Sequence, residues 1–331
     1  METTMKVLFV ASGNSKNFDI APFIKSQGES LIENGIDVQF YPVVGKGILG
    51  YIKSSKKLKL FLKENSFDLI HAHYTLSGLT AVFSRPKIPI VLSLMGSDAY
   101  GEYIGHKKVK FSSRYLTLLT YLIQPFVQAI FSKSPNIDKF VYRKKIAHIV
   151  PNGVIFEKFV QIEKKKAKAD LGLSPKEKYV LFLGDPKSNR KNYSLARRSV
   201  DLINNPNIKL LTPYPTTHDN VIKHFNAADV FVMCAFMEGS PNVVKEAMVC
   251  NCPVVTTDVG DAAWVVGDTP GCYVASFTPQ DFANKIQQAV SFSDKVGRTE
   301  GRKRIIELGL SATTVANRIS NLYTEVIDKH K

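Results

Sequence analysis

The sequence predicts an α/β protein made of two Rossmann-like domains, each a doubly wound parallel sheet. The 331 residues suffice for two domains of about 150 residues each. Short runs rich in Val, Ile and Leu alternate with segments at helical spacing, which is the pattern of parallel strands and crossover helices. The alternation restarts after the basic stretch Glu163 to Lys178. We therefore expect one domain over residues 1–155 and a second over residues 156–331.

The first half contains six short apolar runs that predict strands. Between the first two runs, Ile20, Ile24 and Leu31 recur at helical spacing and Gly35 marks the helix end. A longer apolar segment, Tyr115–Phe131, is interrupted by Thr, Gln and Pro and predicts a buried helix followed by a strand. The six strands are expected at Lys6–Ala11, Ile36–Pro42, Asp68–Ala72, Ile88–Leu94, Gln128–Ser132 and Ile146–Val150.

The second half repeats this alternation and ends in an amphipathic helix. Along Ser311–Ile327 the residues Val315, Ile319 and Tyr323 lie on one stripe, so this helix closes the fold and can pack back on the first domain. The strands of the second half are expected at Tyr179–Leu183, Ile208–Thr212, Asp229–Cys234, Pro253–Thr257 and Cys272–Ala275.

The composition excludes several classes of protein. No apolar run reaches the roughly 18 residues that a membrane-spanning helix needs, and the N-terminus enters a strand without the pattern of a signal peptide. We therefore expect a cytoplasmic protein. Cys250 and Cys252 are too close for a normal disulfide and have no second pair for zinc, so the four cysteines are interpreted as small apolar side chains.

The positive charge is concentrated in the first half. Residues 1–160 carry 21 Lys or Arg against 11 Asp or Glu, a net +10, and residues 161–331 carry 23 against 18, a net +5. Three basic runs, at Lys53–Lys63, His106–Arg114 and Tyr142–Lys145, would attract nucleic acid, anionic lipid headgroups or sugar phosphates. Apolar residues interleave with lysine in the first run, as on a membrane-surface helix or a solvated helix face. The three runs together favour a peripheral membrane surface.

Polar residues follow several strands of the first half. Gly13 lies in the loop Ala11 to Asp19, which opens a helix whose N-terminus favours an anion, although the loop lacks the dinucleotide-binding fingerprint. His71 and His73 form an H-x-H pair without a third metal ligand. We expect one to donate a hydrogen bond in the cleft between the two predicted domains and the other to pack. Asp98 belongs to an acceptor-side polar loop or to a helix cap.

Two loops of the second half carry charged side chains at predicted strand ends. In YVLFLGDPKSNRKN, the cations Lys187, Arg190 and Lys191 precede a helix, which predicts an anion site. In EGSPNVVKE, Glu238 and Glu246 flank a turn, and Asn242 is expected to cap the helix that follows. Amides at a helix start suit a phosphate and a carboxylate suits a pair of hydroxyls, so a ribose diphosphate fits both.

The stretch EGSPNVVKEAM resembles the E-x7-E signature of retaining glycosyltransferases of family 4, which have the GT-B architecture of two facing Rossmann-like domains. Further segments resemble that family in the same order. They are DLIHAHYTLSG, GSDAYG, PNGV, LFLGD with RKN, NAADVFV and CPVVTTDVGDAAWVVGD.

The resemblance assigns roles to individual residues. It implies that Glu246 binds the ribose hydroxyls of a nucleoside-diphosphate sugar, that Glu238 contacts the hydroxyls of the donor sugar, and that Lys191 binds phosphate. Two positions depart from the family: Asp185 stands where an arginine is usual, so Arg190 or Lys187 would substitute for it, and Met95 replaces a histidine. His73 and Asp98 remain as acceptor-side candidates. Donor contacts are also implied for Gly239, Ser240, Pro241, Asn242 and Val243, with Gly13 on the first loop.

The activity that the resemblance implies is transfer of a sugar, with retention of configuration, to a hydroxyl of a glycan or lipid-linked acceptor in surface polysaccharide synthesis. It implies no metal and no cofactor besides the donor substrate, and no nucleic acid partner. A nucleotide-sugar epimerase or phosphorylase with the same fold, and a non-catalytic polyanion-binding protein, stay open as alternatives.

Overall fold

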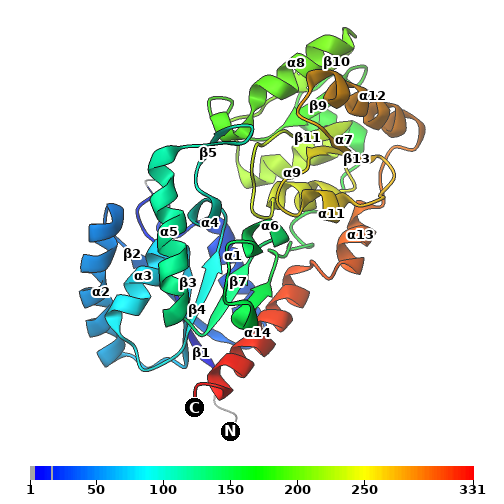
Figure 1. Ribbon diagram of the computed structural model, residues 1–331. Coiled ribbons are helices and arrows are strands. Elements are labelled where there is room, and N and C mark those ends of the chain that lie inside the picture. The colour runs from blue at the N-terminus through cyan, green and yellow to red at the C-terminus, as the bar shows by residue number, and fades with distance from the viewer. Residues whose placement is uncertain (1–3, 16–17) are drawn as a thin grey trace. The chain divides into compact units, whose positions relative to one another are not determined.

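The computed structural model describes residues 4–15 and 18–331. Contacts between residues divide the chain into two units (Figure 1). Unit 1 comprises Met1–Glu102, Lys110–Gly153 and Ala312–Lys331, and unit 2 comprises Tyr103–Val109 and Val154–Ser311. Both units have the parallel-sheet, Rossmann-like fold that the sequence predicts.

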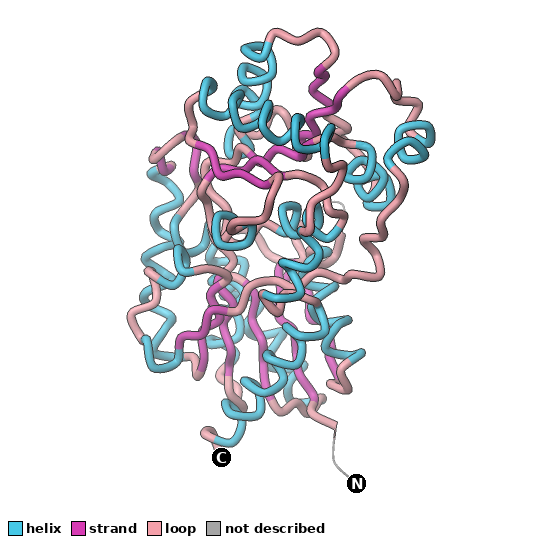
Figure 2. The backbone as a smooth tube through the Cα atoms, turned by 90° about the vertical axis from the view of Figure 1, so that its right-hand side faces the viewer, coloured by secondary structure: helices cyan, strands magenta, loops and turns pink. Residues whose placement is uncertain are grey.

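The sheet of unit 1 has the strand order β2-β1-β3-β4-β7-β8, with all neighbours parallel. Figure 2 shows these strands side by side with helices packed around them. The order reverses between β1 and β3, which makes the sheet doubly wound. Each strand overlaps a predicted apolar run. The strands are β1 (Lys6–Ser12), β2 (Asp37–Val43), β3 (Leu69–His73), β4 (Ile90–Leu94), β7 (Ala129–Ser132) and β8 (Ala147–Ile149).

The final helix, α14, belongs to unit 1. Its Val315, Ile319 and Tyr323 enter the same core as Phe9 of β1 and Ile24 of α1. The helices of unit 1 are α1 (Pro22–Glu33), α2 (Gly47–Glu64), α3 (Thr75–Ser84), α4 (Ser97–Tyr100), α5 (Arg114–Ile123), α6 (Pro135–Asp138) and α14 (Ala312–Asp328), with 3-10 turns η1 (Phe111–Ser113), η2 (Gln124–Phe126) and η3 (Lys144–Ile146).

The helix of the apolar segment Tyr115–Phe131 exists as α5, but the prediction that it is buried is wrong. Tyr115, Leu118 and Leu122 are exposed, whereas Thr120 on the opposite side is fully buried. The hydroxyl of Thr120 donates to the carbonyl of Asp98 at 2.7 Å. The buried hydrogen bond of Thr120 therefore places the polar side of the helix inside and its apolar side in solvent.

The sheet of unit 2 has the order β10-β9-β11-β12-β13, again parallel throughout. Its order reverses between β9 and β11, so the loops that follow these two strands meet at the carboxyl edge, where ligands bind in such sheets. The strands are β9 (Lys178–Phe182), β10 (Ile208–Leu211), β11 (Val230–Met233), β12 (Val254–Thr257) and β13 (Cys272–Ala275). The helices are α7 (Lys164–Asp170), α8 (Tyr193–Ile203), α9 (His218–Ala227), α10 (Asn242–Val249), α11 (Ala262–Val266), α12 (Pro279–Lys295) and α13 (Gly301–Glu307), with η4 (Asn189–Lys191).

A short hairpin that the sequence did not predict joins unit 2 from the first half of the chain. It pairs β5 (Tyr103–Gly105) with β6 (Lys108–Val109), and β5 contacts η4. At its turn, the ring of His106 lies 4.5 Å from that of Phe277.

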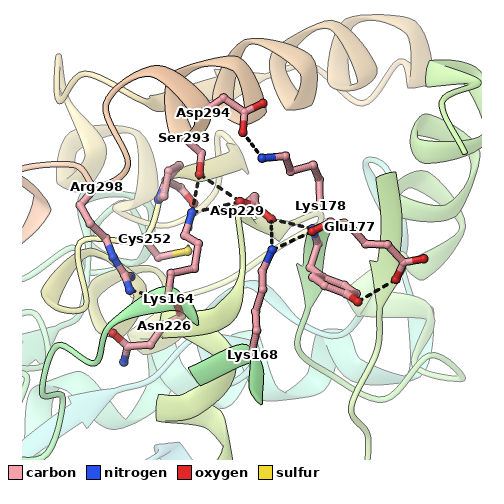
Figure 3. Close-up of polar contacts among 12 residues, drawn as sticks. Lys164, Lys168, Glu177, Lys178, Asn226, Asp229, Cys252, Ser293, Asp294 and Arg298 are labelled. Carbon is pink, nitrogen blue, oxygen red and sulfur yellow. Dashed lines mark hydrogen bonds and ion pairs between the residues drawn. The ribbon is translucent and has the colours of Figure 1, made fainter. Parts of the chain in front are cut away.

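A buried polar cluster lies at the amino edge of the second sheet (Figure 3). The Asp229 carboxylate, which is 2% exposed, accepts from Lys164 at 3.0 Å and Lys168 at 3.4 Å. It also accepts from the amide of Tyr179 at 2.8 Å and the hydroxyl of Ser293 at 3.2 Å. Burial opposes ionisation of Asp229, but these partners hold its pKa below the usual range. The cluster ties α7 and α12 to the sheet.

Candidate functional site

The loop after β9 is pinned to the loop after β11. Gly184 has φ +152°, and a Cβ there would lie 3.3 Å from the side chain of Lys191. The side-chain amide of Asn192 donates to the carbonyl of Cys234 at 3.2 Å, and the amide of Phe236 donates to the carbonyl of Arg190 at 2.9 Å. These contacts fix two consecutive cations beside the residues that follow β11.

The structure brings Glu238, Arg190 and Lys191 into one cluster. The Nζ of Lys191 lies 2.8 Å from Oε1 of Glu238, and the guanidinium of Arg190 donates to the same oxygen. Burial favours the neutral acid, but the two cations hold the pKa of Glu238 below its usual range. Two positive charges face one carboxylate, so the cluster keeps an excess of positive charge that suits a polyanionic ligand.

A buried ion pair holds the turn between Glu238 and α10 in place. Lys245 and Asp261 are almost fully buried and lie 3.3 Å apart. The Nζ of Lys245 donates to the hydroxyl of Ser240 at 2.5 Å, and this hydroxyl donates to Asp261 at 2.7 Å. Neither charged residue was predicted to belong to the site, although a lysine within the apolar helix NVVKEAMV is a signal.

A glycine lets the next loop approach this turn. Gly260 has φ +63°, and a Cβ there would lie 2.5 Å from the carbonyl oxygen of Gly239. The Gly239 backbone is buried, and Val243 is partly exposed on the first turn of α10. The prediction that Asn242 caps the helix is wrong, because Pro241 occupies the cap position and Asn242 is the first helical residue. The proline has a fixed φ suited to the turn, which shifts the helix start by one residue.

Glu246 lies in the second turn of α10. Within the described part of the chain, its carboxylate makes no ion pair or side-chain hydrogen bond, unlike that of Glu238. Burial raises the pKa of Glu246 to about 7, although the neighbouring Lys245 opposes the rise. A partly buried carboxylate without a partner is suited to accept hydrogen bonds from a ligand.

Lys187 shares the loop of Arg190 and Lys191 without joining their cluster. Its backbone amide donates to the carboxylate of Asp185 at 2.9 Å, and its side chain is exposed. The structure therefore gives Asp185 the role of shaping the turn.

Gly13 has a packing role in unit 1. Its amide donates to the carbonyl of Val43 at 2.8 Å, and a Cβ would lie 2.8 Å from that of Pro42. The close approach of β1 to β2 therefore requires glycine at this position. Residues 16 and 17 of the same predicted anion loop lie outside the described residues.

The two histidines of β3, His71 and His73, are both buried. His71 makes hydrogen bonds to the hydroxyls of Tyr323 at 2.5 Å and Ser93 at 2.7 Å. His73 packs with its ring centroid 4.2 Å from that of His71 and 4.6 Å from that of Phe9. Burial lowers the pKa of both imidazoles well below the usual value, so both are neutral. In the residues described, no group of His, Cys, Asp or Glu could hold a metal ion.

Asp98 ties together the ends of β3 and β4. Its carboxylate, 3% exposed, accepts from the amides of Gly96 at 2.8 Å, Met95 at 3.1 Å and Thr75 at 3.2 Å. Burial raises the pKa of Asp98, and the three amides oppose the rise. The helix-cap prediction is wrong for α4, because Gly96 occupies its cap position and no side chain caps the helix. Asp98 joins the two strand ends instead.

Two family models match the chain in the order of its two sheets. Residues 4–134 match a model described as "Glycosyl transferase 4-like", and residues 176–291 match one described as "Glycosyl transferases group 1". The second match includes every residue from Lys187 to Glu246 named above.

Solved glycosyltransferase structures have the same fold. Sucrose-phosphate synthase from Thermosynechococcus elongatus aligns with a TM-score of 0.81 and 16% identity, over 98% of this chain and 100% of that chain. Anabaena Alr3699/HepE in complex with UDP aligns with a TM-score of 0.74 and 14% identity, over 97% and 100%. At these identities the likeness establishes the fold, which is that of the GT-B glycosyltransferases.

Curated relatives share only low sequence identity with this chain. TuaC of Bacillus subtilis, a glycosyltransferase assigned to teichuronic acid biosynthesis, is 25% identical over 60% of this chain and 55% of its own length. The UDP-Gal:alpha-D-GlcNAc-diphosphoundecaprenol alpha-1,3-galactosyltransferase of Escherichia coli is 22% identical over 95% of this chain and 90% of its length. The chain spans 55% to 59% of the length of the first curated relatives that it matches.

Proposed function

We propose that the protein is a retaining glycosyltransferase that moves a sugar from a nucleoside-diphosphate sugar to a hydroxyl acceptor. The observation that carries the proposal is the cluster of Glu238, Arg190 and Lys191 at the switch point of the second sheet. An excess of cations beside a helix N-terminus suits a diphosphate. The order of the two glycosyltransferase models along the chain supports the same function.

In this mechanism the diphosphate replaces Glu238 as the partner of the two cations. Lys191 and Arg190 stabilise the charge that gathers on the leaving diphosphate. Backbone amides of the turn and of the first turn of α10 contribute as well, namely those of Gly239, Ser240, Asn242 and Val243. Glu238 is then free to accept from hydroxyls of the donor sugar. Glu246 accepts from the ribose hydroxyls.

The chemistry needs no separate acid and base. The bond between the anomeric carbon and the phosphate oxygen breaks, and the acceptor oxygen forms its bond on the face that the diphosphate leaves. The departing phosphate oxygen takes the acceptor proton, so configuration is retained and nucleoside diphosphate is released. We propose that no metal or other cofactor takes part, and that His73 and Asp98 shape the acceptor side by holding strand ends rather than by contacting the acceptor.

For the acceptor we propose a glycan or a lipid-linked sugar of surface polysaccharide synthesis. The names of the Bacillus subtilis and Escherichia coli relatives support this class. Such an acceptor places the enzyme in the cytoplasm at the inner face of the membrane. We propose no nucleic acid partner.

The function is tested by replacing Glu246 with alanine and measuring donor hydrolysis and sugar transfer. We expect both activities to be lost while the circular dichroism spectrum is unchanged. The exposed Glu307 provides a matched control, since Glu307→Ala should keep full activity. Full activity of Glu246→Ala would contradict the proposal.

Product release with and without an acceptor distinguishes a transferase from the alternative reaction classes. A transferase releases nucleoside diphosphate faster when an acceptor is added, whereas an epimerase or phosphorylase forms its product without a sugar acceptor. A polyanion-binding protein would instead bind any nucleic acid duplex, with an affinity that falls steeply with salt.

A further inference from the structure

Helix α5 and the turns that flank it, η1 and η2, present large apolar side chains to solvent. Phe111, Tyr115, Leu118, Leu122 and Phe126 recur every three or four residues and so form one stripe, which we call the α5 stripe. Phe111 is 82% exposed, and Leu118, Leu122 and Phe126 are each between 57% and 60% exposed. Figure 1 shows α5 along the outside of unit 1.

The orientation of this helix is fixed by polar anchors on its inner side. Thr120, fully buried, donates to the carbonyl of Asp98 at 2.7 Å. Gln124, also fully buried, donates to the carbonyl of Phe140 at 2.8 Å and accepts from the amide of Tyr142 at 3.0 Å. A rotation that buried the stripe would break these hydrogen bonds, so the apolar side belongs outside. Exposed apolar stripes of this length mark interaction surfaces.

The charge around the stripe is positive. From Lys110 to Lys145 the chain has seven Lys or Arg and a single acid, Asp138. The guanidinium of Arg114 lies 5.8 Å from the centre of the Phe111 ring, and Lys145 is exposed. The described residues contain no helix long and apolar enough to cross a bilayer.

We propose that the α5 stripe inserts into the surface of an anionic lipid bilayer, with α5 lying in the plane of the interface. Apolar side chains enter the boundary between headgroups and acyl chains, and Arg114 and Lys145 contact anionic headgroups. The stacked pair Tyr121 and Tyr142, with ring centres 6.3 Å apart, lies beside the stripe and suits the interfacial layer.

The basic helix α2 lacks this arrangement. Its Tyr51 and Leu58 are buried, and its lysines face solvent beside the isolated exposed residues Leu49 and Leu60. The run Lys53–Lys63 is therefore a solvated helix face, and the exposed apolar surface lies on α5 instead.

A second copy of the chain fits the stripe less well than a bilayer does. A symmetric dimer places the same patch on both subunits, so Arg114 and Lys145 would face their own copies, whereas Lys110 is already paired with Glu102. An anionic surface neutralises Arg114 and Lys145 instead.

The test is sedimentation of the full chain with vesicles of phosphatidylcholine alone or mixed with phosphatidylglycerol. We expect binding to the mixed vesicles and at least a tenfold loss, as an order of magnitude, in the double variant Leu118→Ser with Leu122→Ser. The matched control is Leu49→Ser with Leu60→Ser on α2, which should bind as the wild type does. Equal losses in both variants, or no loss on α5, would overturn the proposal.

Two further measurements complete the test. Replacing Arg114 and Lys145 with glutamine should weaken binding only to the anionic vesicles, and an equal effect on both vesicle types would contradict the role of charge. If sedimentation equilibrium shows a dimer that the α5 variant abolishes, a second copy covers the stripe and the proposal is wrong. These assays contain no nucleotide or acceptor, so their failure leaves the proposed donor site untouched.

Discussion

Two clusters of Lys, Arg and carboxylate side chains lie at opposite edges of the second sheet. At the amino edge, Asp229 is fully buried and is surrounded by Lys164, Lys168, a backbone amide and a hydroxyl. At the carboxyl edge, Glu238 is 16% exposed, and its ion pairs to Arg190 and Lys191 are both made by one carboxylate oxygen.

The two clusters contain the same types of residue but differ in whether a ligand can reach the carboxylate and its cations. Every oxygen of Asp229 is occupied by protein donors from several elements, so the cluster holds the fold together. The partners of Glu238 come from one short loop, and a ligand that carries more negative charge can take them. A buried, saturated ion cluster is structural, whereas a partly exposed one with excess charge is a candidate binding site.

The largest expected effect is on stability, at the amino edge. Asp229→Ala leaves Lys164 and Lys168 without their shared carboxylate in a buried place, which should cost about 3–5 kcal/mol of unfolding free energy. Urea denaturation measures this cost. The matched control, Asp201→Ala, removes an acid from the exposed pair with Arg197 and should cost less than about 1 kcal/mol. Similar costs in the two variants would contradict a structural role of the Asp229 cluster.

The next effect is on catalysis, at the carboxyl edge. Lys191→Ala removes a cation from the leaving diphosphate and should lower kcat about 100- to 1,000-fold, while the unfolding free energy changes by less than about 1 kcal/mol. Steady-state kinetics and urea denaturation on the same preparation separate the two quantities. Arg197→Ala removes one exposed cation away from the cluster; it is the control and should keep kcat. A stability loss in Lys191→Ala as large as in Asp229→Ala would contradict a functional cluster.

The smallest of these effects concerns Glu246 and depends on pH. Its pKa is raised from 4.5 to about 7, so ionisation penalises the folded state as pH rises above 4.5, and the penalty is complete above about pH 7. Glu246→Gln should therefore unfold at a higher temperature than the wild type at pH 8, by about 2–4 °C for each kcal/mol removed. The difference should vanish near pH 4.

Ionisation of Glu246, which lowers the stability of the fold, should raise the affinity for the donor. Donor affinity of the wild type should rise as pH passes upward through about 7, because only the ionised Glu246 accepts from both ribose hydroxyls. The affinity of Glu246→Gln should be weaker and independent of pH in this range. A wild-type thermal profile identical to that of Glu246→Gln at pH 8 would show that this carboxylate is not destabilised by burial.

The sequence predicted the sheets well because parallel strands are local apolar runs. All eleven expected runs overlap strands of the two sheets, and the switch point between β9 and β11 follows from their order. The proximity of Glu238 to Lys191 could also be predicted, since both residues follow neighbouring strands whose carboxyl ends meet at one edge. Burial of the four cysteines was predicted as well.

What the sequence did not predict depends on contacts between distant residues. The pairing of Lys245 with Asp261 joins a helix to a later loop, and the hairpin at Tyr103–Val109 is too short to show strand periodicity. The apolar content of α5 indicated burial because a one-dimensional pattern does not say which face packs. Only the contacts of Thr120 and Gln124 determine that the apolar face lies outside.

Binding of a nucleoside diphosphate at the carboxyl edge is the central expectation for this protein. Titration calorimetry with UDP, GDP and ADP, each beside its monophosphate, measures this binding. We expect one diphosphate to bind more tightly than its monophosphate. Lys191→Ala should remove that difference in affinity, and Arg197→Ala should preserve it. Equal affinity for diphosphate and monophosphate, or an unchanged difference in Lys191→Ala, would contradict this expectation.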